Sequence, residues 1–293
     1  MFSCGVEQPL APRVVSVVNM KGGVGKSTTV ASLAETLSAE GLRVLVIDLD
    51  PQSNVSMMLA GQDRWIDLRQ KNKTIDEYFN QFVYATEPRF FRDFIAHMVS
   101  DLVGEPKLDL LIATPEFRYI ERHALEKWVS QGFDIRQLNT RFSRLTHSAI
   151  ENVSDNYDLV LFDCPPGISM FAEAAIELSE FIVIPTIPDY VSRLGIFAFR
   201  KRALRSMEQR RFTEDRIWTL VTKFEEANAL HTSEAQLLCD QFNVFKTRIP
   251  QTEQIARAAE WSDKKRSLDQ KYGAAANVIR KFAGEFRERA GLI

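Results

Sequence analysis

The residues best suited to chemistry lie between positions 21 and 28, in the run Lys-Gly-Gly-Val-Gly-Lys-Ser-Thr. Glycines let successive backbone N–H groups turn inward around phosphate oxygens, and a helix that starts there adds the positive end of its dipole. Lys26 supplies a point charge for the β- and γ-phosphates of a nucleotide, and the Ser27 hydroxyl is a ligand for Mg²⁺. The run therefore predicts a phosphate-binding loop made of Lys21, Gly22, Gly23, Val24, Gly25, Lys26, Ser27 and Thr28.

Carboxylates follow two of the apolar runs of the chain. Asp48 and Asp50 stand in the sequence Asp-Leu-Asp-Pro-Gln, and Asp163 stands in Asp-Cys-Pro-Pro-Gly. An isolated aspartate at a strand end is about as often a helix N-cap. Because ligands of open α/β sheets bind beyond the carboxyl ends of the strands, these aspartates and the phosphate loop can meet around one Mg²⁺. We expect Ser27, Asp48 and Asp163 as the metal ligands, and we assign no chemistry to Cys164.

Short runs rich in Val, Ile and Leu alternate with helical stretches. The runs are Val14–Asn19, Val44–Asp48, Leu108–Ala113, Leu159–Asp163, Phe181–Pro185 and Ile217–Thr222. Continuous apolar character marks strands that are buried on both faces, which predicts a mainly parallel sheet with helices on either side. This is a doubly wound α/β fold, and its first helix is expected to begin near Lys26 and to end before Gly41.

Two connections are too long to be simple loops, since usual βα connections have about two to six residues. We expect an N-terminal extension at 1–12 and one domain at 13–293, with helical insertions at about 60–106 and 115–156. An apolar helix face is predicted at Ile135, Leu138, Phe142, Leu145, Ala149 and Val153. An aromatic cluster, interpreted as core rather than partner surface, comprises Tyr78, Phe79, Phe82, Tyr84, Phe90, Phe91 and Phe94.

Composition narrows the class of protein. The chain has 293 residues, 45% of them hydrophobic, and a formal net charge of −2. No run approaches the roughly 18 apolar residues that cross a bilayer, and the start shows no secretory pattern, so a cytoplasmic location without stable membrane insertion is expected. The three cysteines are widely spaced, and no histidine stands at ligand spacing from a cysteine or carboxylate, which argues against a disulfide framework or a transition-metal site.

The phosphate loop departs from the strict GxxxxGK[ST] pattern, because Met20 stands where glycine is required. It matches instead the variant KGGxGK[ST], and in this the chain resembles the ParA/MinD family of P-loop ATPases. The Asp48–Gln52 segment is like that of ParA and Soj, whereas MinD carries a different sequence there. The resemblance runs from about Val14 to the last helix.

The resemblance implies ATP and Mg²⁺ as cofactors, an ATP-dependent homodimer, and slow hydrolysis stimulated by a ParB-like or other adaptor protein. It gives Lys26 a role at the phosphates of its own subunit, and makes Lys21 cross the dimer interface to the phosphates of the other. Asp50 would position the attacking water, and Asp48 would support the magnesium shell. The adenine would lie near the loop after the sixth strand and near Pro250.

Basic residues gather between positions 193 and 216, where 8 Lys or Arg face 3 Asp or Glu and give a net charge of +5. The helix there is expected to turn toward the core the residues Leu194, Phe197, Ala198, Leu204 and Met207. Lys201, Arg202 and Arg205 would then face solvent, and two such faces in a dimer would bind DNA without sequence preference and hold the protein on the nucleoid.

Two alternatives stay open. A MinD-like ATPase at the membrane surface would use a free basic amphipathic helix, for which the apolar residues Val278, Ile279, Phe282 and Phe286 of the last helix are candidates. A metabolic enzyme on the same scaffold would need a small acceptor substrate. The cargo, whether plasmid, chromosome or protein assembly, is not readable from the residues.

Overall fold

A single parallel sheet organises the chain. The structure is a computed structural model that describes residues 11–84, 88–167, 169–207 and 213–292. Its strands among these residues are β1 (Arg13–Val17), β2 (Val44–Asp48), β3 (Leu108–Leu111), β4 (Leu159–Asp163), β5 (Phe181–Thr186) and β6 (Ile217–Val221). They lie in the order β3-β2-β4-β1-β5-β6, and every neighbouring pair is parallel. All six predicted strands are confirmed, and so is the doubly wound α/β class.

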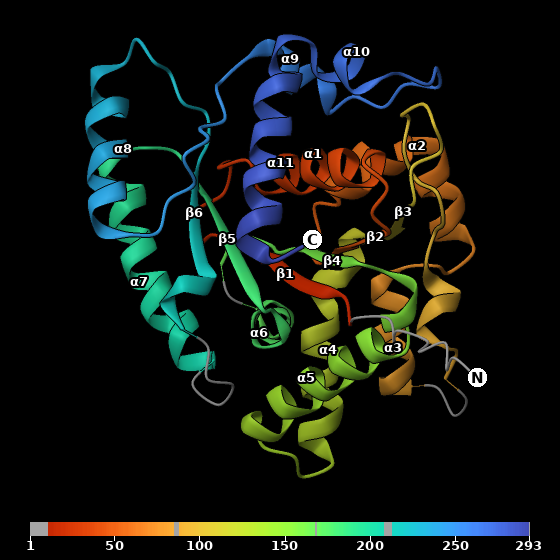
Figure 1. Ribbon diagram of the computed structural model, residues 1–293. Coiled ribbons are helices and arrows are strands. Elements are labelled where there is room, and N and C mark those ends of the chain that lie inside the picture. The colour runs from red at the N-terminus through yellow and green to blue at the C-terminus, as the bar shows by residue number, and fades with distance from the viewer. Residues whose placement is uncertain (1–10, 85–87, 168, 208–212, 293) are drawn as a thin grey trace, which may run out of the picture.

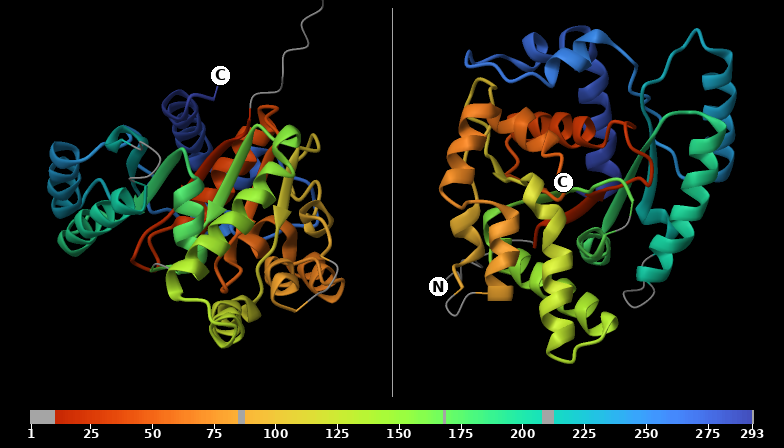
Figure 2. Two further views of the ribbon diagram at one scale, coloured as in Figure 1. Left: turned by 90° about the horizontal axis from the view of Figure 1, so that it is seen from below. Right: turned by 180° about the vertical axis from the view of Figure 1, so that it is seen from behind.

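Helices cover both faces of this sheet (Figure 1). They are α1 (Lys26–Ala39), α2 (Asn54–Gln70), α3 (Ile75–Tyr84), α4 (Ile120–Ser130), α5 (Ile135–Glu151), α6 (Met170–Leu178), α7 (Tyr190–Met207), α8 (Ala229–Gln241), α9 (Glu253–Ala258), α10 (Leu268–Tyr272) and α11 (Ala276–Ala290). Alternate residues of β1 enter different cores, Val14 on the side of α3–α8 and Val15 on the side of α1, α2 and α11. The views from below and from behind show the same layers, with α7 and α8 beside β6 and with α2 and α3 at the opposite edge (Figure 2).

The long connections carry helices, as the sequence predicts. On the predicted apolar face, Leu138, Phe142 and Ala149 of α5 and Val153 just after it are buried, and Leu145 is partly buried. The side chain of Ile135 lies outside the described part of the chain. The aromatic cluster is mainly core, with the rings of Tyr78, Phe79, Phe91 and Phe94 buried. Tyr84 and Phe90 are instead 56% and 60% exposed, so they do not belong to this core.

Helix α7 exposes the face that we predicted to be buried. Leu194, Phe197 and Ala198 are exposed, and the side that packs on the sheet carries Ile196 and Phe199. The prediction was wrong because α7 has apolar residues on two opposite faces, and periodicity alone cannot choose between them. The other two residues predicted for the core, Leu204 and Met207, have side chains outside the described part of the chain.

Helix α11 docks on its own sheet. Ile279 is buried among α9 and α10 residues, and Phe282 and Phe286 are buried in the core shared with α1 and α2, while Val278 is partly buried. Its C-terminal turn is held by an ion pair between Arg287 of α11 and Glu40 at the end of α1, at 3.0 Å. No helix within the described ranges is both long enough and apolar enough to cross a bilayer.

Candidate functional site

The predicted phosphate loop joins β1 directly to α1. Gly23 and Gly25 have φ values of 73° and 85°, in the left-handed region that residues with a Cβ seldom adopt. Gly25 is also the residue before the first turn of α1, so the free backbone N–H groups of that turn point back toward the space that the loop encloses. Helix α1 ends at Ala39, and Gly41 follows at a φ of 101°, which confirms the predicted end.

This loop forms one wall of a cavity of about 540 Å³. Of the residues predicted for the site, those that line the cavity are Gly22, Gly23, Gly25, Lys26, Ser27, Thr28 and Asp50. Val24 is fully buried, and its carbonyl accepts a hydrogen bond of 2.8 Å from the Thr222 hydroxyl. The structure thus brings together most of a predicted site whose parts lie up to about thirty residues apart in the chain.

Lys26 lies at the bottom of the loop with its ammonium largely removed from water. Its Nζ donates to the carbonyl of Lys21 at 3.3 Å. Burial lowers the pKa of Lys26, and the nearby Asp163 and Asp50 oppose this shift. The ammonium is held in place and its positive charge is only partly compensated by the aspartates, so it can bind phosphate oxygens.

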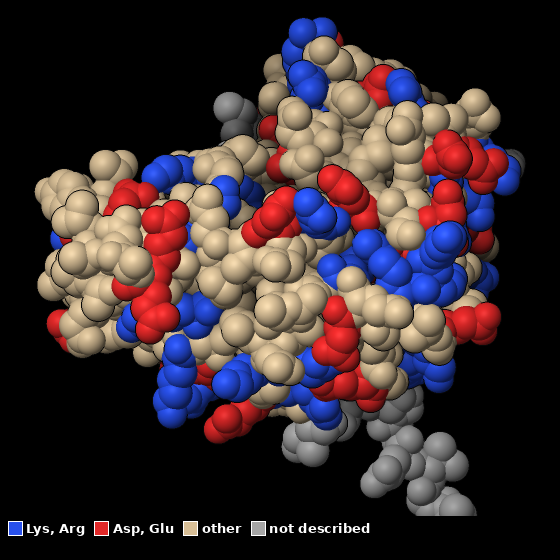
Figure 3. All heavy atoms as spheres, turned by 90° about the horizontal axis from the view of Figure 1, so that it is seen from above, with Lys and Arg blue, Asp and Glu red and all other residues tan. Residues whose placement is uncertain are grey.

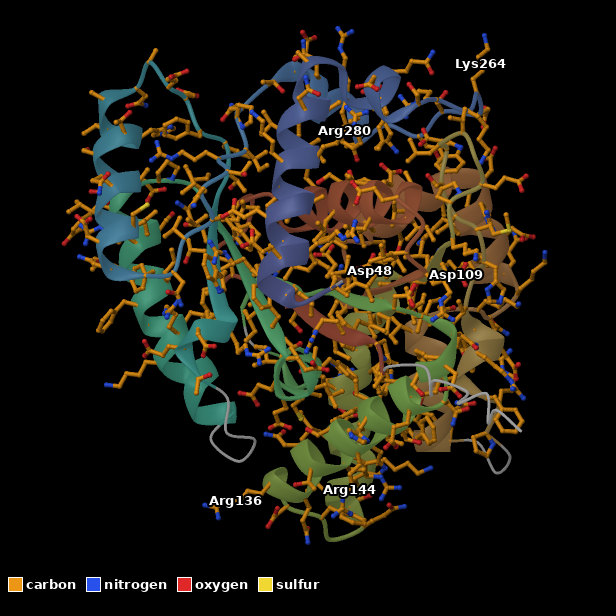
Figure 4. The ribbon with its side chains drawn as sticks, in the orientation of Figure 1. Asp48, Asp109, Arg136, Arg144, Lys264 and Arg280 are labelled. Atoms are coloured by element: carbon orange, nitrogen blue, oxygen red, sulfur yellow. The ribbon has the colours of Figure 1, made fainter. Side chains whose placement is uncertain are left out.

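Two aspartates lie side by side beneath the loop. Asp48 and Asp163 are register partners at the ends of β2 and β4, and both are fully buried. Asp48 is fully engaged, since it accepts from the Asp50 N–H at 2.9 Å and from the Ser56 hydroxyl at 2.6 Å. Burial raises the pKa of Asp48 to about 7 in spite of these hydrogen bonds. Figure 4 shows Asp48 near the centre of the molecule.

Asp163 differs from Asp48 because neither of its oxygens has a hydrogen-bond partner among the described residues. The Ser27 hydroxyl is near enough to favour the charged form, although it does not meet the geometry of a hydrogen bond. Burial, and then the charge of Asp48, raise the pKa of Asp163 well above its usual range. A divalent cation between Asp163 and Ser27 would compensate the buried negative charge of Asp163, because hard cations bind oxygen ligands. The residues present therefore fit Mg²⁺.

Lys21 points away from the cavity. Its Nζ lies 3.0 Å from Asp189 Oδ2 and 3.1 Å from Ser192 Oγ, at the N-terminal end of α7. The Lys21 side chain remains 43% exposed. Within one chain, Lys21 therefore does not reach the cavity that Lys26 lines.

Several lining residues were not predicted. They are Gln52, Asn54, Met57, Met58, Pro166, Lys223 and Ala259. A smaller cavity of about 60 Å³ adjoins the loop and is lined by Thr222, Lys223, Ile249 and Pro250, in the two regions where the adenine was expected. Lys223 follows β6 and has a positive φ of 51°. Sequence patterns do not predict this conformation for a lysine, so its place at the cavity could not be predicted.

The predicted DNA-binding residues are placed only in part. Lys201 is exposed on α7, whereas the side chains of Arg202 and Arg205 lie outside the described part of the chain. Arg200, counted in the basic segment, is buried and donates from Nη1 to the Ile217 carbonyl at 3.1 Å.

Asp163→Asn tests the uncompensated charge. The raised pKa values mean that the folded protein binds more protons than the unfolded chain between about pH 4 and 7, so the free energy of unfolding falls as pH rises through this window. At pH 8, without nucleotide or Mg²⁺, we expect Asp163→Asn to be more stable than the wild type by about 1–3 kcal/mol, and the gain to shrink toward pH 5. Urea unfolding across this pH range measures it.

Asp109→Asn is the matched control for this test. The Asp109 carboxylate accepts from the Tyr157 hydroxyl at 2.7 Å and from the Met98 N–H at 2.8 Å, so its neutralisation should destabilise the protein. A loss of stability in Asp163→Asn at pH 8 would contradict the picture of a carboxylate without partners.

Comparison with known proteins shows the family of the chain. The model of a family described as an AAA domain matches residues 12–213. The sporulation initiation inhibitor protein Soj of Bacillus subtilis is 28% identical over 186 residues, which are 63% of this chain and 62% of that protein. The chain spans 42% to 62% of the length of the first curated relatives that it matches.

Two solved structures share the fold. A plasmid partition protein of Borrelia burgdorferi, bound to AMPPNP, has a TM-score of 0.71 at 19% identity, covering 95% of this chain and 99% of that one. Cobyrinic acid a,c-diamide synthase of Mycobacterium smegmatis, with an ATP analogue and magnesium, has a TM-score of 0.67 at 21% identity, covering 96% of each chain. Since the family model covers more than half of the sequence and the variant phosphate loop is in place, the chain belongs to the ParA/MinD family of P-loop ATPases.

Proposed function

We propose that the chain is a ParA-like ATPase that binds Mg²⁺-ATP in the 540 Å³ cavity, dimerises on it, and uses slow hydrolysis to position or segregate a cargo. The observation that carries this proposal is the partnerless carboxylate of Asp163 beneath a glycine-rich loop that ends on Lys26. A buried negative charge next to an anion-binding loop needs a cation to connect it to the anion. Mg²⁺ bound to a nucleotide meets both requirements.

The cavity residues divide the work of phosphoryl transfer to water. Bound Mg²⁺ would neutralise charge on the phosphates, held by Ser27 and Asp163. Lys26 and the N–H groups at the start of α1 would bind the phosphate oxygens. Asp48, whose oxygens are engaged by Ser56 and Asp50, fixes the shape of the Asp48–Gln52 loop rather than facing the cavity.

Asp50 is the one carboxylate among the described lining residues of the cavity. It accepts a hydrogen bond from the Gln52 N–H at 2.9 Å, which holds its side chain at the cavity wall. From there Asp50 can orient a water for attack, but the described lining residues include no histidine to act as a base. Slow turnover follows, as suits a switch that a partner protein stimulates.

The position of Lys21 supports a dimer. Its ammonium is paired with Asp189 and Ser192 and points away from its own cavity, while its side chain remains 43% exposed, so a second subunit could exchange this surface ion pair for a phosphate contact. A second subunit that faces this surface would present its phosphates to Lys21, as the family resemblance implies.

Asp50→Ala and Lys21→Ala should separate the two roles. We expect Asp50→Ala to bind ATP, to lose most of its turnover and to accumulate as a dimer, because Asp50 acts on water and not on the phosphates. Lys21→Ala should lose both ATP-dependent dimerisation and turnover. Size exclusion with ATP and Mg²⁺, together with phosphate release, measures both. An Asp50→Ala protein that stays monomeric while the wild type dimerises would overturn the assignment.

The outer face of α7 supports an adaptor protein as partner. Tyr190, Val191, Leu194 and Phe197 lie on one side of the helix and are 50% to 68% exposed. They stand opposite Ile196 and Phe199, which pack on the sheet. A helix that is apolar on both sides is normally buried on both sides, so this face suits an apolar helix of the activating partner.

DNA binding is proposed through Lys201, Arg202 and Arg205 of α7, which follow this apolar face in the sequence. Another basic group is visible from above, on the side where Figure 4 places Lys264, and acidic side chains border it (Figure 3). Two of the basic residues near Lys264 are already engaged, since Arg266 is paired with Asp101 and Lys265 donates to the Ser100 carbonyl at 2.6 Å. The α7 segment therefore remains the better candidate for phosphate contacts.

Arg202→Ala/Arg205→Ala should weaken DNA binding in the ATP state. Loss of up to about four phosphate contacts per dimer would flatten the slope of log K against log salt by roughly 3 to 4 units. Fluorescence anisotropy with unrelated duplexes over a salt series measures the slope. Arg136→Ala/Arg144→Ala is the control, because both arginines are exposed on α5 at the base of the molecule (Figure 4). A changed slope in the control with an unchanged slope in the α7 variant would relocate the DNA surface.

The membrane alternative is disfavoured by α11. The apolar residues that would enter a bilayer, Ile279, Phe282 and Phe286, are buried against the rest of the chain. A cytoplasmic, nucleoid-associated ATPase is therefore the function proposed.

A further inference from the structure

The nucleotide cavity is bounded by two segments that lie far apart in the sequence. Asn54, Met57 and Met58 come from the first half of α2, directly after the Asp48–Gln52 loop. Ala259 comes from the end of α9, about two hundred residues later. Whatever fixes the distance between these two segments also fixes the width of the cavity and the position of the loop that carries Asp50.

The two segments touch at Gly61 and Trp261. A Cβ built on Gly61 would lie 2.6 Å from the Cδ1 and Cγ atoms of the Trp261 indole, closer than real Cβ contacts come. The indole thus rests directly on the backbone at position 61, and only glycine leaves room for it. We call this the Trp261–Gly61 contact.

Gly61 is also the place where α2 is interrupted. Its φ of 73° and ψ of 164° are not helical and divide α2 into a half before Gly61 and a half after it. Non-glycine residues are strained at such angles. Both halves reach the sheet from this bend: the Ser56 hydroxyl of the first half donates to Asp48 at 2.6 Å, and the Trp65 indole N–H of the second half donates to the Ala113 carbonyl at 2.9 Å. The direction of the first half therefore depends on the backbone at Gly61, where the helix changes course.

The Trp261 side of the contact is held firmly. The Ser262 N–H donates to Asp101 at 3.2 Å, and the guanidinium of Arg266 pairs with the same carboxylate. Lys271, which is also buried, binds Glu35 of α1 at 2.6 Å and Asp101 at 2.7 Å. Because breaking one partner of such a buried network leaves an uncompensated charge, the segment that carries Trp261 is tied rigidly to the helix that follows the phosphate loop.

We propose that Trp261 is a positioning residue for ATP hydrolysis. Its indole, seated on Gly61, holds the first half of α2 and the preceding Asp50 loop against the cavity, and this inference rests on the proposed ATPase function. The 259–272 segment, which is tied to α1, acts as the frame against which Trp261 sets the bend of α2 at Gly61. Trp261 is not among the described residues that line the cavity, so it acts through the position of the Asp50 loop.

The first test needs no nucleotide. Amide hydrogen exchange over residues 54–61 should rise about tenfold in Trp261→Ala, because the bend of α2 at Gly61 loses the indole that covers its backbone. Trp218→Ala is the matched control, since Trp218 is a partly buried tryptophan of β6 that packs on Phe245. Unchanged exchange over 54–61 in Trp261→Ala would overturn the proposal.

The second test reads the function. With Mg²⁺-ATP, Trp261→Ala should lose about tenfold in kcat, with KM changed by less than about threefold, since the phosphate contacts remain. Mg²⁺-AMPPNP should alter the indole emission of the wild type and of Trp218→Phe, but not that of Trp261→Phe. Should Trp261→Ala fold poorly, Trp261→Phe keeps a ring on Gly61 and the emission comparison decides.

The outcomes separate the two proposals. If Mg²⁺-AMPPNP changes the indole emission of Trp261→Phe as much as that of the wild type, the positioning role is contradicted. A rise in KM with an unchanged kcat in Trp261→Ala would contradict it as well. A wild type that binds no AMPPNP by calorimetry would remove the ATPase proposal, while the exchange measurement would still decide whether Trp261 supports α2.

Discussion

The structure depends on a charge that the fold buries without satisfying. Asp163 is fully buried at the end of β4, and neither carboxylate oxygen has a partner among the described residues. Its neighbour Asp48 uses its own oxygens to shape the Asp50 loop and adds a second negative charge. Lys26, whose pKa is lowered by burial, opposes this charge from above. The arrangement is complete only when a cation and an anion enter together, which is how a nucleotide-dependent switch can be built from a few residues.

The same constraint gives meaning to the parts around it. The strands that end at Asp48 and Asp163 are register partners in the middle of the sheet, so the aspartates cannot move apart without disrupting the sheet. The first half of α2 bends at Gly61 under the Trp261 indole, and the segment that carries Trp261 is fixed by the Glu35–Lys271–Asp101 network. The floor of the cavity is therefore set by the sheet, and the wall formed by α2 is set by the contact between Trp261 and Gly61.

Much of this was predictable from the sequence because the signals are local. Strands β2 and β4 are continuous apolar runs that end in aspartate, and the phosphate loop stands between a strand and a helix, so both could be placed before the structure was known. The outward face of α7 could not be predicted in this way. Leu194 and Phe197 have the apolar character of core residues, but Ile196 and Phe199 are the residues of α7 that are buried. The Trp261–Gly61 contact joins residues two hundred positions apart and carries no local signal at all.

The central claim is that Lys26 and the metal-ready Asp163 form one site for Mg²⁺ and nucleotide. The most direct test is calorimetric titration of AMPPNP into the wild type and into Lys26→Ala, each with and without Mg²⁺, with circular dichroism to check the fold. The account predicts Mg²⁺-dependent binding to the wild type and none to a folded Lys26→Ala. Equal affinity in the two proteins, or wild-type binding that is indifferent to Mg²⁺, would contradict it.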